Sequence, residues 1–272
     1  MRKVVTKYLC VLCAIGGFIE TALPAPKMAF QIYGVRELAA KDFRGTLKAA
    51  AAIGYKGVET GRFYGFTAKE LKNACGEAGL EIVALQLYPY NLTEPQLAET
   101  IRFCKECGCK RINTAWYKGS EENVNDWQLM VNVLNHAAEV CAKEGIKVAY
   151  HNHDHEFSMK RGEKTIWEWL WTKHPPKIDD KQVAQMVPFS EKVGIEFDPA
   201  NAAKGGADAL HVVAKALPRK SECMHVTLET PLDWKAVIAA ASPEWLVVKP
   251  ATGADSTAEL KRQFEVLAGA FK

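Results

Sequence analysis

The sequence predicts a closed (β/α)8 barrel, in which eight parallel strands alternate with eight helices. Short apolar segments alternate strictly with longer helical segments from residue 28 to the end of the chain. The short segments are nearly continuous apolar runs, as is typical of parallel strands that are covered on both faces. No G-x-G-x-x-G motif follows the first of them, which disfavours an open dinucleotide-binding sheet. Eight such units over roughly 250 residues fit one closed barrel.

The expected elements can be written down in order along the chain. The expected strands are residues 28–33, 56–60, 81–88, 110–116, 146–151, 193–198, 223–227 and 244–249. The expected helices are residues 41–54, 67–79, 93–108, 125–145, 164–173, 207–217, 232–242 and 256–271. Gly54, Gly79 and Gly145 each follow an amphipathic pattern, at the place where a left-handed residue commonly ends a helix.

The first 25 residues predict a secretory signal peptide, which leaves residues 26–272 as a single barrel domain. Basic residues precede an apolar run of about a dozen residues, and small residues follow that run. The run is too short to span a bilayer. We therefore expect an exported protein, periplasmic or secreted, with no stable membrane span once the leader is removed. The alternative is a buried N-terminal helix.

Charge and composition argue against a nucleic-acid partner. The formal charge of the whole chain is +3, and the basic start of the leader accounts for much of it. The mature domain is therefore close to neutral, whereas a nucleic-acid enzyme needs a basic face. A small-molecule partner is expected instead, and the sequence does not predict an oligomeric state.

One cluster of cysteines could suggest a structural metal. The segment "FCKECGC" (103–109) holds three of the six cysteines that follow the leader. A zinc site needs about four ligands, and no second C-x-x-C motif is present to complete one. We therefore expect small buried residues at the end of a helix and the start of the next strand.

Polar residues stand at the carboxyl ends of several expected strands, where barrels of this class carry their active sites. His151, Asp198 and His225 come from the fifth, sixth and seventh strands. Two imidazoles and a carboxylate suit a divalent ion such as Mn²⁺, Fe²⁺, Co²⁺ or Zn²⁺, because nitrogen ligands disfavour Mg²⁺ and Ca²⁺. The alternative is that each residue is only a hydrogen-bonded polar group in the mouth of the barrel.

Five motifs, in this order and spacing, resemble the sugar phosphate isomerase/epimerase superfamily, the xylose-isomerase-like TIM barrels. They are "GYKGVE", "YHNHDHEF", "EFDPANAAKGGAD", "HVT" and "LDWKAVI", and the likeness runs from about Phe30 to Phe271. The resemblance implies a mononuclear metal site with ligands from strands 5 to 8. Matched by position, the first three ligands are His151, Asp198 and His225. In many relatives the ligands from strands 5 and 8 are glutamates that also move a proton next to the sugar carbonyl.

The chain departs from this pattern in two places. Lys249 stands where the strand 8 glutamate is expected, and a protonated ammonium has no lone pair and repels a cation. We therefore expect an ion that is held weakly, or no ion at all. The loop after strand 7 lacks the usual glycine-rich insertion, since "HVTLET" leads directly into "PLDWKAV", and extra sequence precedes strand 6.

The roles of the remaining polar residues follow from the chemistry that the resemblance implies. Proton transfer next to a carbonyl needs a base within hydrogen-bond reach, and a metal would stabilise the charge that develops. Glu156 is the best remaining carboxylate for that base and Glu59 the next. Lys249 could contribute only if neutral, or by holding an anionic or carbonyl substrate. Residues expected to bind the substrate are His153, Trp116 and Arg36.

Three classes of function are compatible with these features. The first is a metal-dependent sugar isomerase or epimerase. The second is a lyase or hydrolase that acts on an oxidised glycoside through the same enolisation. The third is a non-catalytic barrel that binds a carbohydrate, which Lys249 would favour. Two of these classes are enzymes, and an isomerase or epimerase is our first expectation.

Overall fold

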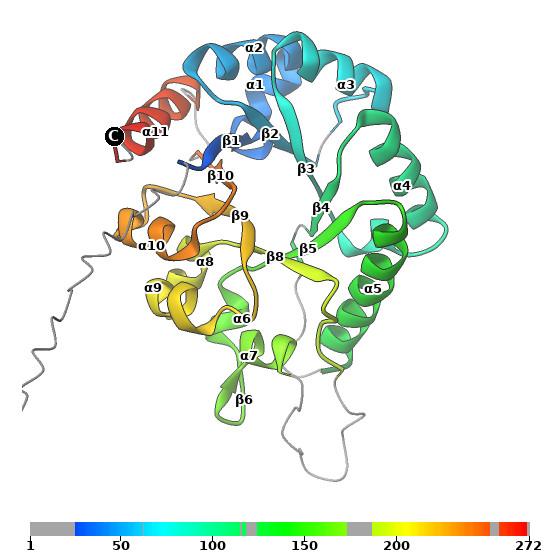
Figure 1. Ribbon diagram of the computed structural model, residues 1–272, viewed down its shortest axis with the longest axis vertical. Coiled ribbons are helices and arrows are strands. Elements are labelled where there is room, and N and C mark those ends of the chain that lie inside the picture. The colour runs from blue at the N-terminus through cyan, green and yellow to red at the C-terminus, as the bar shows by residue number, and fades with distance from the viewer. Residues whose placement is uncertain are drawn as a thin grey trace, which may run out of the picture.

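The computed structural model describes residues 25–61, 63–114, 116–117, 124–172, 187–250 and 256–270. Figure 1 shows strands gathered at the centre of the molecule with helices arranged around them. The predicted signal peptide, apart from Ala25, lies outside the described residues. Among the helices described, none has the length and apolar character that crossing a membrane requires.

Eight strands form one closed barrel, which confirms the predicted fold class. Neighbouring strands are parallel, and the order around the ring is β1-β10-β9-β8-β5-β4-β3-β2. The first strand pairs with both the second and the last, so that Lys27 lies opposite Trp245. The strands are β1 (Lys27–Gln31), β2 (Gly57–Thr60), β3 (Glu81–Leu87), β4 (Arg111–Thr114), β5 (Lys147–His151), β8 (Val193–Phe197), β9 (Ser221–Val226) and β10 (Trp245–Val248).

Helices cover the outside of the ring where the sequence expects them. The main ones are α2 (Phe43–Ile53), α3 (Ala68–Glu77), α4 (Gln96–Cys107), α5 (Val124–Lys143), α7 (Ile166–Trp171), α10 (Trp234–Ala241) and α11 (Ser256–Ala270). The helix expected at 207–217 is instead a short α9 (Ala209–His211) followed by a π-helical turn, η3 (Val212–Ala216). Short additional elements are η1 (Ile32–Val35), α1 (Arg36–Lys41), η2 (Pro89–Leu92), α6 (His155–Ser158), α8 (Pro199–Lys204) and the hairpin β6 (Lys160–Arg161) with β7 (Lys164–Thr165).

The ends of these helices follow the local sequence. Thr67 caps α3 and exchanges hydrogen bonds with Glu70, an arrangement that satisfies backbone donors at the helix start. Gly54, Gly79 and Gly145 have φ angles of 128°, 72° and 70°, as predicted for residues that end a helix. The turns between helices and strands are therefore encoded by residues that tolerate a positive φ.

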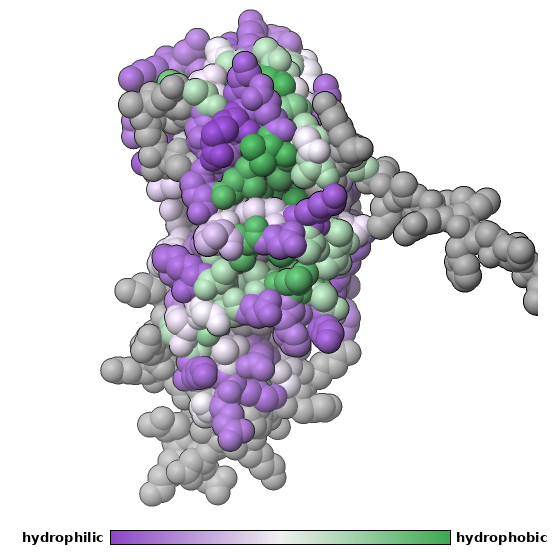
Figure 2. Space-filling model, turned by 90° about the vertical axis from the view of Figure 1, so that its left-hand side faces the viewer, coloured by the Kyte–Doolittle hydropathy of each residue, from purple (hydrophilic) through white to green (hydrophobic). Residues whose placement is uncertain are grey.

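The hydrophobic core has two parts. The larger part lies between the strands and the helices and includes Trp127, Trp169 and Tyr55, all nearly inaccessible to solvent. Each such side chain contributes about 2–3 kcal/mol by leaving water. The smaller part is a separate apolar cluster of Ala29, Val83, Cys223, Trp245 and Val247. On the side of the molecule where α10 and α11 lie, Figure 2 shows hydrophobic residues interspersed with hydrophilic ones.

The cysteines of the described chain are buried and unpaired. Cys104 and Cys107 belong to α4, and Cys109 precedes β4, as the sequence predicted for the "FCKECGC" segment. Burial raises the pKa of the Cys109 thiol to about 12, so this thiol is protonated and unreactive. These cysteines therefore act as small core residues.

Candidate active site

The carboxyl ends of four neighbouring strands place the predicted polar residues in one mouth of the barrel. His151 is the last residue of β5, Asp198 directly follows β8, and His225 is the penultimate residue of β9. Lys249 directly follows β10. Asp198 is also the N-cap of α8, where its side chain accepts a hydrogen bond from the backbone amide of Asn201 at 2.9 Å. The start of that helix therefore fixes the direction of the carboxylate.

His151, Asp198 and His225 form a compact cluster that is 3%, 0% and 0% exposed. One ligand atom of each lies within 4.8 Å of the other two. The two imidazole rings are 4.3 Å apart between centroids, and His225 Nδ1 is 3.7 Å from Asp198 Oδ2. The structure thus brings together the three residues that the sequence selected.

The unsatisfied atoms of this cluster fit a divalent metal ion. His225 Nδ1 is buried without a hydrogen-bond partner among the described residues, and so is His151 Nδ1, which lies 3.3 Å from Glu196 Oε2. A buried polar atom without a partner costs about 1–3 kcal/mol, so such atoms call for a ligand. Two imidazoles and one carboxylate are the donor set that Mn²⁺, Fe²⁺, Co²⁺ and Zn²⁺ accept.

Lys249 faces the same cluster. Its Nζ is 3.3 Å from Asp198 Oδ2, and its side chain is 31% exposed. Burial alone would raise the pKa of Asp198, but the adjacent His225 imidazole and the charge of Lys249 together outweigh it and hold that pKa well below its usual range. An ion and the lysine ammonium would therefore compete for one carboxylate oxygen.

Two further carboxylates lie beneath the cluster, inside the barrel. Glu59 and Glu196 are completely buried, and His225 Nε2 is 3.0 Å from Glu59 Oε1 and 3.5 Å from Glu196 Oε2. Glu59 also accepts hydrogen bonds from Gln31 at 3.2 Å and from Asn113 at 2.9 Å. Asn113 donates to Glu196 as well. Metal-binding histidines commonly have a carboxylate on the ring nitrogen that faces away from the metal.

The charged side chains of this buried group shift one another's pKa values. Burial would lower the pKa of His225, but Glu196 and Glu59 raise it to about 10. Burial raises the pKa of Glu196 well above its usual range, and the charge of Glu59 adds to the effect. The pKa of Glu59 is lowered, because the attraction of His225 outweighs burial. Glu59, His225 and Glu196 therefore share charge as one unit.

Glu196 was missed in the sequence, although a signal for it exists. It stands two residues before Asp198 in "VGIEFD", and residues two apart on a strand face the same side. Glu59 was predicted as a possible base, and the structure places it beneath the cluster rather than at the mouth. Its position favours holding His225 over contact with a substrate.

Glu156 lies in a buried site of its own. Its Oε1 accepts a hydrogen bond from the Tyr150 hydroxyl, and its Oε2 accepts one from the backbone amide of His153 at 2.9 Å. Its Oε2 is also 3.6 Å from His155 Nε2. Burial raises the pKa of Glu156. Both oxygens are thus occupied, and the geometry favours a carboxylate that orders the loop after β5.

Of the three predicted substrate-binding residues, His153 and Trp116 adjoin the cluster. The His153 ring lies edge-on to His151 at 4.9 Å and to Trp116 at 4.6 Å between centroids. Trp116 is 46% exposed. Arg36 lies instead on α1, where its guanidinium is stacked on the Tyr33 ring at 4.6 Å and donates a hydrogen bond to the Tyr33 carbonyl oxygen.

A cavity of about 540 Å³ opens beside Lys249. Part of its lining comes from the short connection between β9 and α10. Its lining combines hydroxyl, amide and charged groups with small apolar ones, namely Ala200, Asn201, Ala203, Lys204, Thr227, Glu229, Thr230, Pro231, Leu232 and Lys249. Such a mixture suits a polyhydroxylated molecule.

Comparisons with known proteins agree with this geometry. A family model described as xylose isomerase-like TIM barrel matches residues 47–232. An inosose dehydratase of Clostridium botulinum is 28% identical over an alignment of 131 residues that covers 41% of this chain and 44% of that protein. An inosose dehydratase of Geobacillus thermodenitrificans is 24% identical over an alignment of 197 residues that covers 65% of this chain and 60% of that protein. The chain thus spans about half of the length of these two relatives.

A solved structure is similar over a larger share of both chains. It is a sugar phosphate isomerase/epimerase from Parabacteroides distasonis, with a TM-score of 0.68 and 20% sequence identity. The match covers 93% of this chain and 97% of the other. At this identity the match establishes a shared fold.

Proposed function

Because this chain belongs to the xylose isomerase-like TIM barrel family, we propose that it is an enzyme that removes a proton next to the carbonyl group of a carbohydrate. The observation that carries the proposal is the cluster of His151, Asp198 and His225, with Lys249 against it, at the mouth of the barrel. Barrels of this class carry out their chemistry at that end.

The metal-binding part of the site consists of His151, Asp198 and His225. A divalent ion held there would stabilise the negative charge that develops on the carbonyl oxygen. Asn201 orients the Asp198 carboxylate through its backbone amide. Glu59 and Glu196 face the Nε2 atom of His225, which leaves Nδ1 directed toward Asp198.

The proton-transfer groups differ from the pair of glutamates in many relatives. An isomerase or epimerase must return the proton to carbon, whereas an elimination needs one base and one acid. Lys249 provides a proton donor that Asp198 holds in place and that lines the adjoining cavity. His153 provides an imidazole next to His151 and on the rim of the site. This pairing favours elimination.

In the proposed reaction, His153 takes the proton from the carbon next to the carbonyl. The bond between the adjacent carbon and its oxygen substituent breaks, and that oxygen takes a proton from Lys249 Nζ. The products are an unsaturated carbonyl compound and either water or an alcohol. The name of the two curated relatives, inosose dehydratase, describes a reaction of this kind. The cavity beside Lys249 has room for a leaving group larger than water.

A sugar isomerase or epimerase is the second candidate. The same metal-binding cluster and the same first proton transfer would serve it, with the proton returned to carbon instead of to a leaving oxygen. A barrel that only binds a carbohydrate is the outcome if Lys249 prevents an ion from binding.

The test is proton exchange in deuterated water. The purified protein would first be analysed for bound transition metal and then incubated with a panel of inososes and oxidised glycosides. We expect exchange of the proton next to the carbonyl, followed by release of an unsaturated product. In Lys249→Met, exchange should persist while elimination slows by about 100-fold, because general acid catalysis contributes about that much.

Lys69→Met is the matched control for this test. Lys69 is an exposed residue of α3 and lies outside the lining of that cavity. Its replacement should leave both steps unchanged. A protein that holds no metal and exchanges no proton with any compound of the panel would contradict the proposed enzyme.

The proposal also includes export of the mature domain. It rests on the pattern of the leader in the sequence. N-terminal sequencing of protein from its native source should find a start near residue 26. A start at Met1 would contradict the proposed location.

A further inference from the structure

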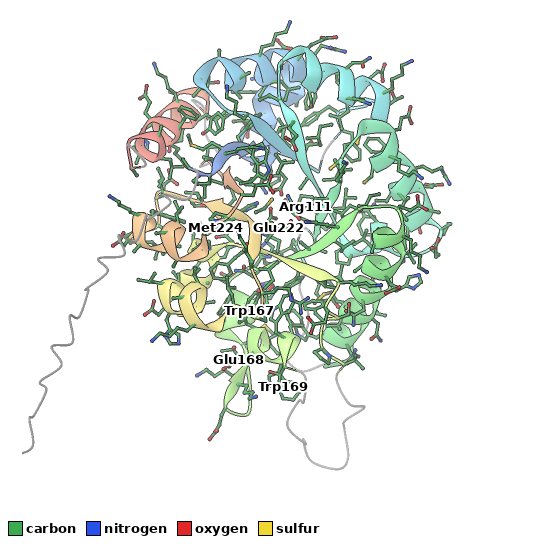
Figure 3. All side chains as sticks on the ribbon, viewed as in Figure 1. Arg111, Trp167, Glu168, Trp169, Glu222 and Met224 are labelled. Atoms are coloured by element: carbon green, nitrogen blue, oxygen red, sulfur yellow. The ribbon has the colours of Figure 1, made fainter. Side chains whose placement is uncertain are left out.

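A second cavity lies at the opposite end of the barrel. Its volume is about 370 Å³, and it is bordered by the amino-terminal ends of β4, β5, β8 and β9. Figure 3 labels Arg111 of β4 and Glu222 of β9, which lie close together there and form an ion pair. The candidate active site lies at the carboxyl ends of the same strands, so this cavity is separate from it.

The lining of this cavity carries an excess of positive charge. Its cationic side chains are Arg111, Lys147, Lys192, Arg219 and Lys220, whereas its carboxylates are only Glu191 and Glu222. Because the mature domain as a whole is close to neutral, this excess is concentrated at one place. Anions in solution would therefore be attracted to this cavity.

The two carboxylates neutralise these cations only in part, and the charge of Glu191 acts on Arg219. Glu222 is shared, because it pairs with Arg111 and also with Lys147 Nζ, 2.6 Å from its Oε1. Lys192 pairs instead with Glu139 of α5, and its Nζ is 2.5 Å from Glu139 Oε2. Among the described residues, Lys220 has neither an ion pair nor a hydrogen bond.

Arg219 also keeps hydrogen-bond donors that no described residue uses. One of its terminal nitrogens donates to the carbonyl oxygens of Ser190 at 2.8 Å and Val193 at 2.5 Å. Its guanidinium lies over the Trp171 ring at 5.0 Å, and its Nε is buried without a hydrogen bond to any described residue. The guanidinium is therefore held in a fixed orientation with donor capacity to spare.

The floor of the cavity consists of small residues. Ala149 and Gly194 line it, and a Cβ added at Gly194 would come no closer to the Ala149 Cβ than 3.4 Å. Small side chains at both positions leave space between β5 and β8. The cavity thus combines a cationic rim with room for a compact molecule.

We propose that this cavity binds a small dianion that carries a phosphate group, either inorganic phosphate or a phosphate monoester. Arginine forks and lysine ammonium groups are the side chains that recognise phosphate oxygens. The five cations face Glu191, Glu222 and the Glu139 that pairs with Lys192, which leaves an excess of two positive charges and favours a dianion over a monoanion. The proposal is independent of the proposed function, since it concerns the other end of the barrel.

Isothermal titration of inorganic phosphate into the purified protein, in a buffer without phosphate or sulfate, tests the proposal. We expect binding at one site per chain that weakens as sodium chloride is raised. Lys220→Glu should weaken binding by about tenfold or more, which corresponds to about 1.4 kcal/mol. Lys220→Arg should retain binding, because it keeps the charge.

Lys48→Glu is the matched control, because Lys48 is an exposed residue of α2 outside the cavity and the charge change is the same. Glucose 6-phosphate and vesicles of phosphatidylcholine with phosphatidic acid form the other arms and distinguish a free ligand from a lipid headgroup. Absence of phosphate binding, equal loss in Lys220→Glu and Lys48→Glu, or binding of the vesicles alone would each overturn the proposal. Thermal melting would confirm that each variant folds.

Discussion

The two ends of the barrel differ in how deeply their charged side chains are buried. At the carboxyl ends of the strands, Glu59, Glu196 and His225 are completely buried and partnered with one another. At the amino-terminal ends, Lys147 and Glu222 have side chains that are 62% and 38% exposed. A single strand, β9, supplies Glu222 to one end and His225 to the other. Charges on the same strand are thus strongly coupled at one end and screened by water at the other.

The largest expected effect is the loss of His225. His225→Ala would leave Glu59 buried without the cation that lowers its pKa, and Asp198 with Lys249 as its only cationic partner among the described residues. Removal of one partner from a buried ion pair costs about 3–5 kcal/mol, so the free energy of unfolding should fall by that amount. Urea denaturation followed by circular dichroism would measure it. A loss below about 1 kcal/mol would show that the carboxylates are neutral in the folded protein.

Stability should also depend on pH through the titration of the buried end. The pKa of His225 is raised from 6.5 to about 10, so its contribution is fully present below its unfolded pKa and is lost as pH rises through about 10. Burial lowers the pKa of His153 to about 3, so its contribution is lost as pH falls from 6.5 toward 3. Thermal melting should therefore show a maximum near neutral pH. His225→Ala should lose the alkaline decline, and an unchanged alkaline decline would contradict this assignment.

The third prediction concerns metal affinity. Lys249→Glu supplies an oxygen ligand and removes a repulsive charge, so it should raise the affinity for Mn²⁺ by about tenfold or more. Calorimetric titration of both forms would measure the change. Lys249→Met is the control, because it removes only the charge and should give a smaller gain. Equal affinities in all three proteins would place Lys249 outside the metal site.

The smallest effect is expected at the exposed end. Lys147→Ala removes one of the two cations paired with Glu222, and exposed pairs contribute about 0–1 kcal/mol. Chemical denaturation should therefore show a change below about 1 kcal/mol that shrinks further at high salt. A loss as large as that of His225→Ala would remove the contrast between the two ends.

The sequence predicted the barrel because each strand is a continuous apolar run and each helix is amphipathic. It located His151, Asp198 and His225 because all three stand at strand ends. It did not reveal Gln31 or Asn113, because isolated polar residues within apolar runs do not show whether they face the barrel interior. Their burial depends on which strands are neighbours in the closed ring.

Contacts that depend on tertiary packing could not be predicted from the sequence either. The sequence predicted Glu156 as the best candidate for the base, and it could not show that this carboxylate is fully buried and bonded to the Tyr150 hydroxyl. The cationic cavity is assembled from residues of four strands that are far apart along the chain. In the sequence each of the charged residues looks like an ordinary solvent-exposed side chain, so their proximity could not be predicted.

The pairing of β1 with β10 has a consequence for the order of events during synthesis. β10 leaves the ribosome after the other seven strands of the ring, so β1 and β9 each keep one unpaired edge until then. Unpaired strand edges are prone to association with other chains. The nascent protein therefore completes its barrel only after β10 has been translated, and until then both edges are open to wrong pairing.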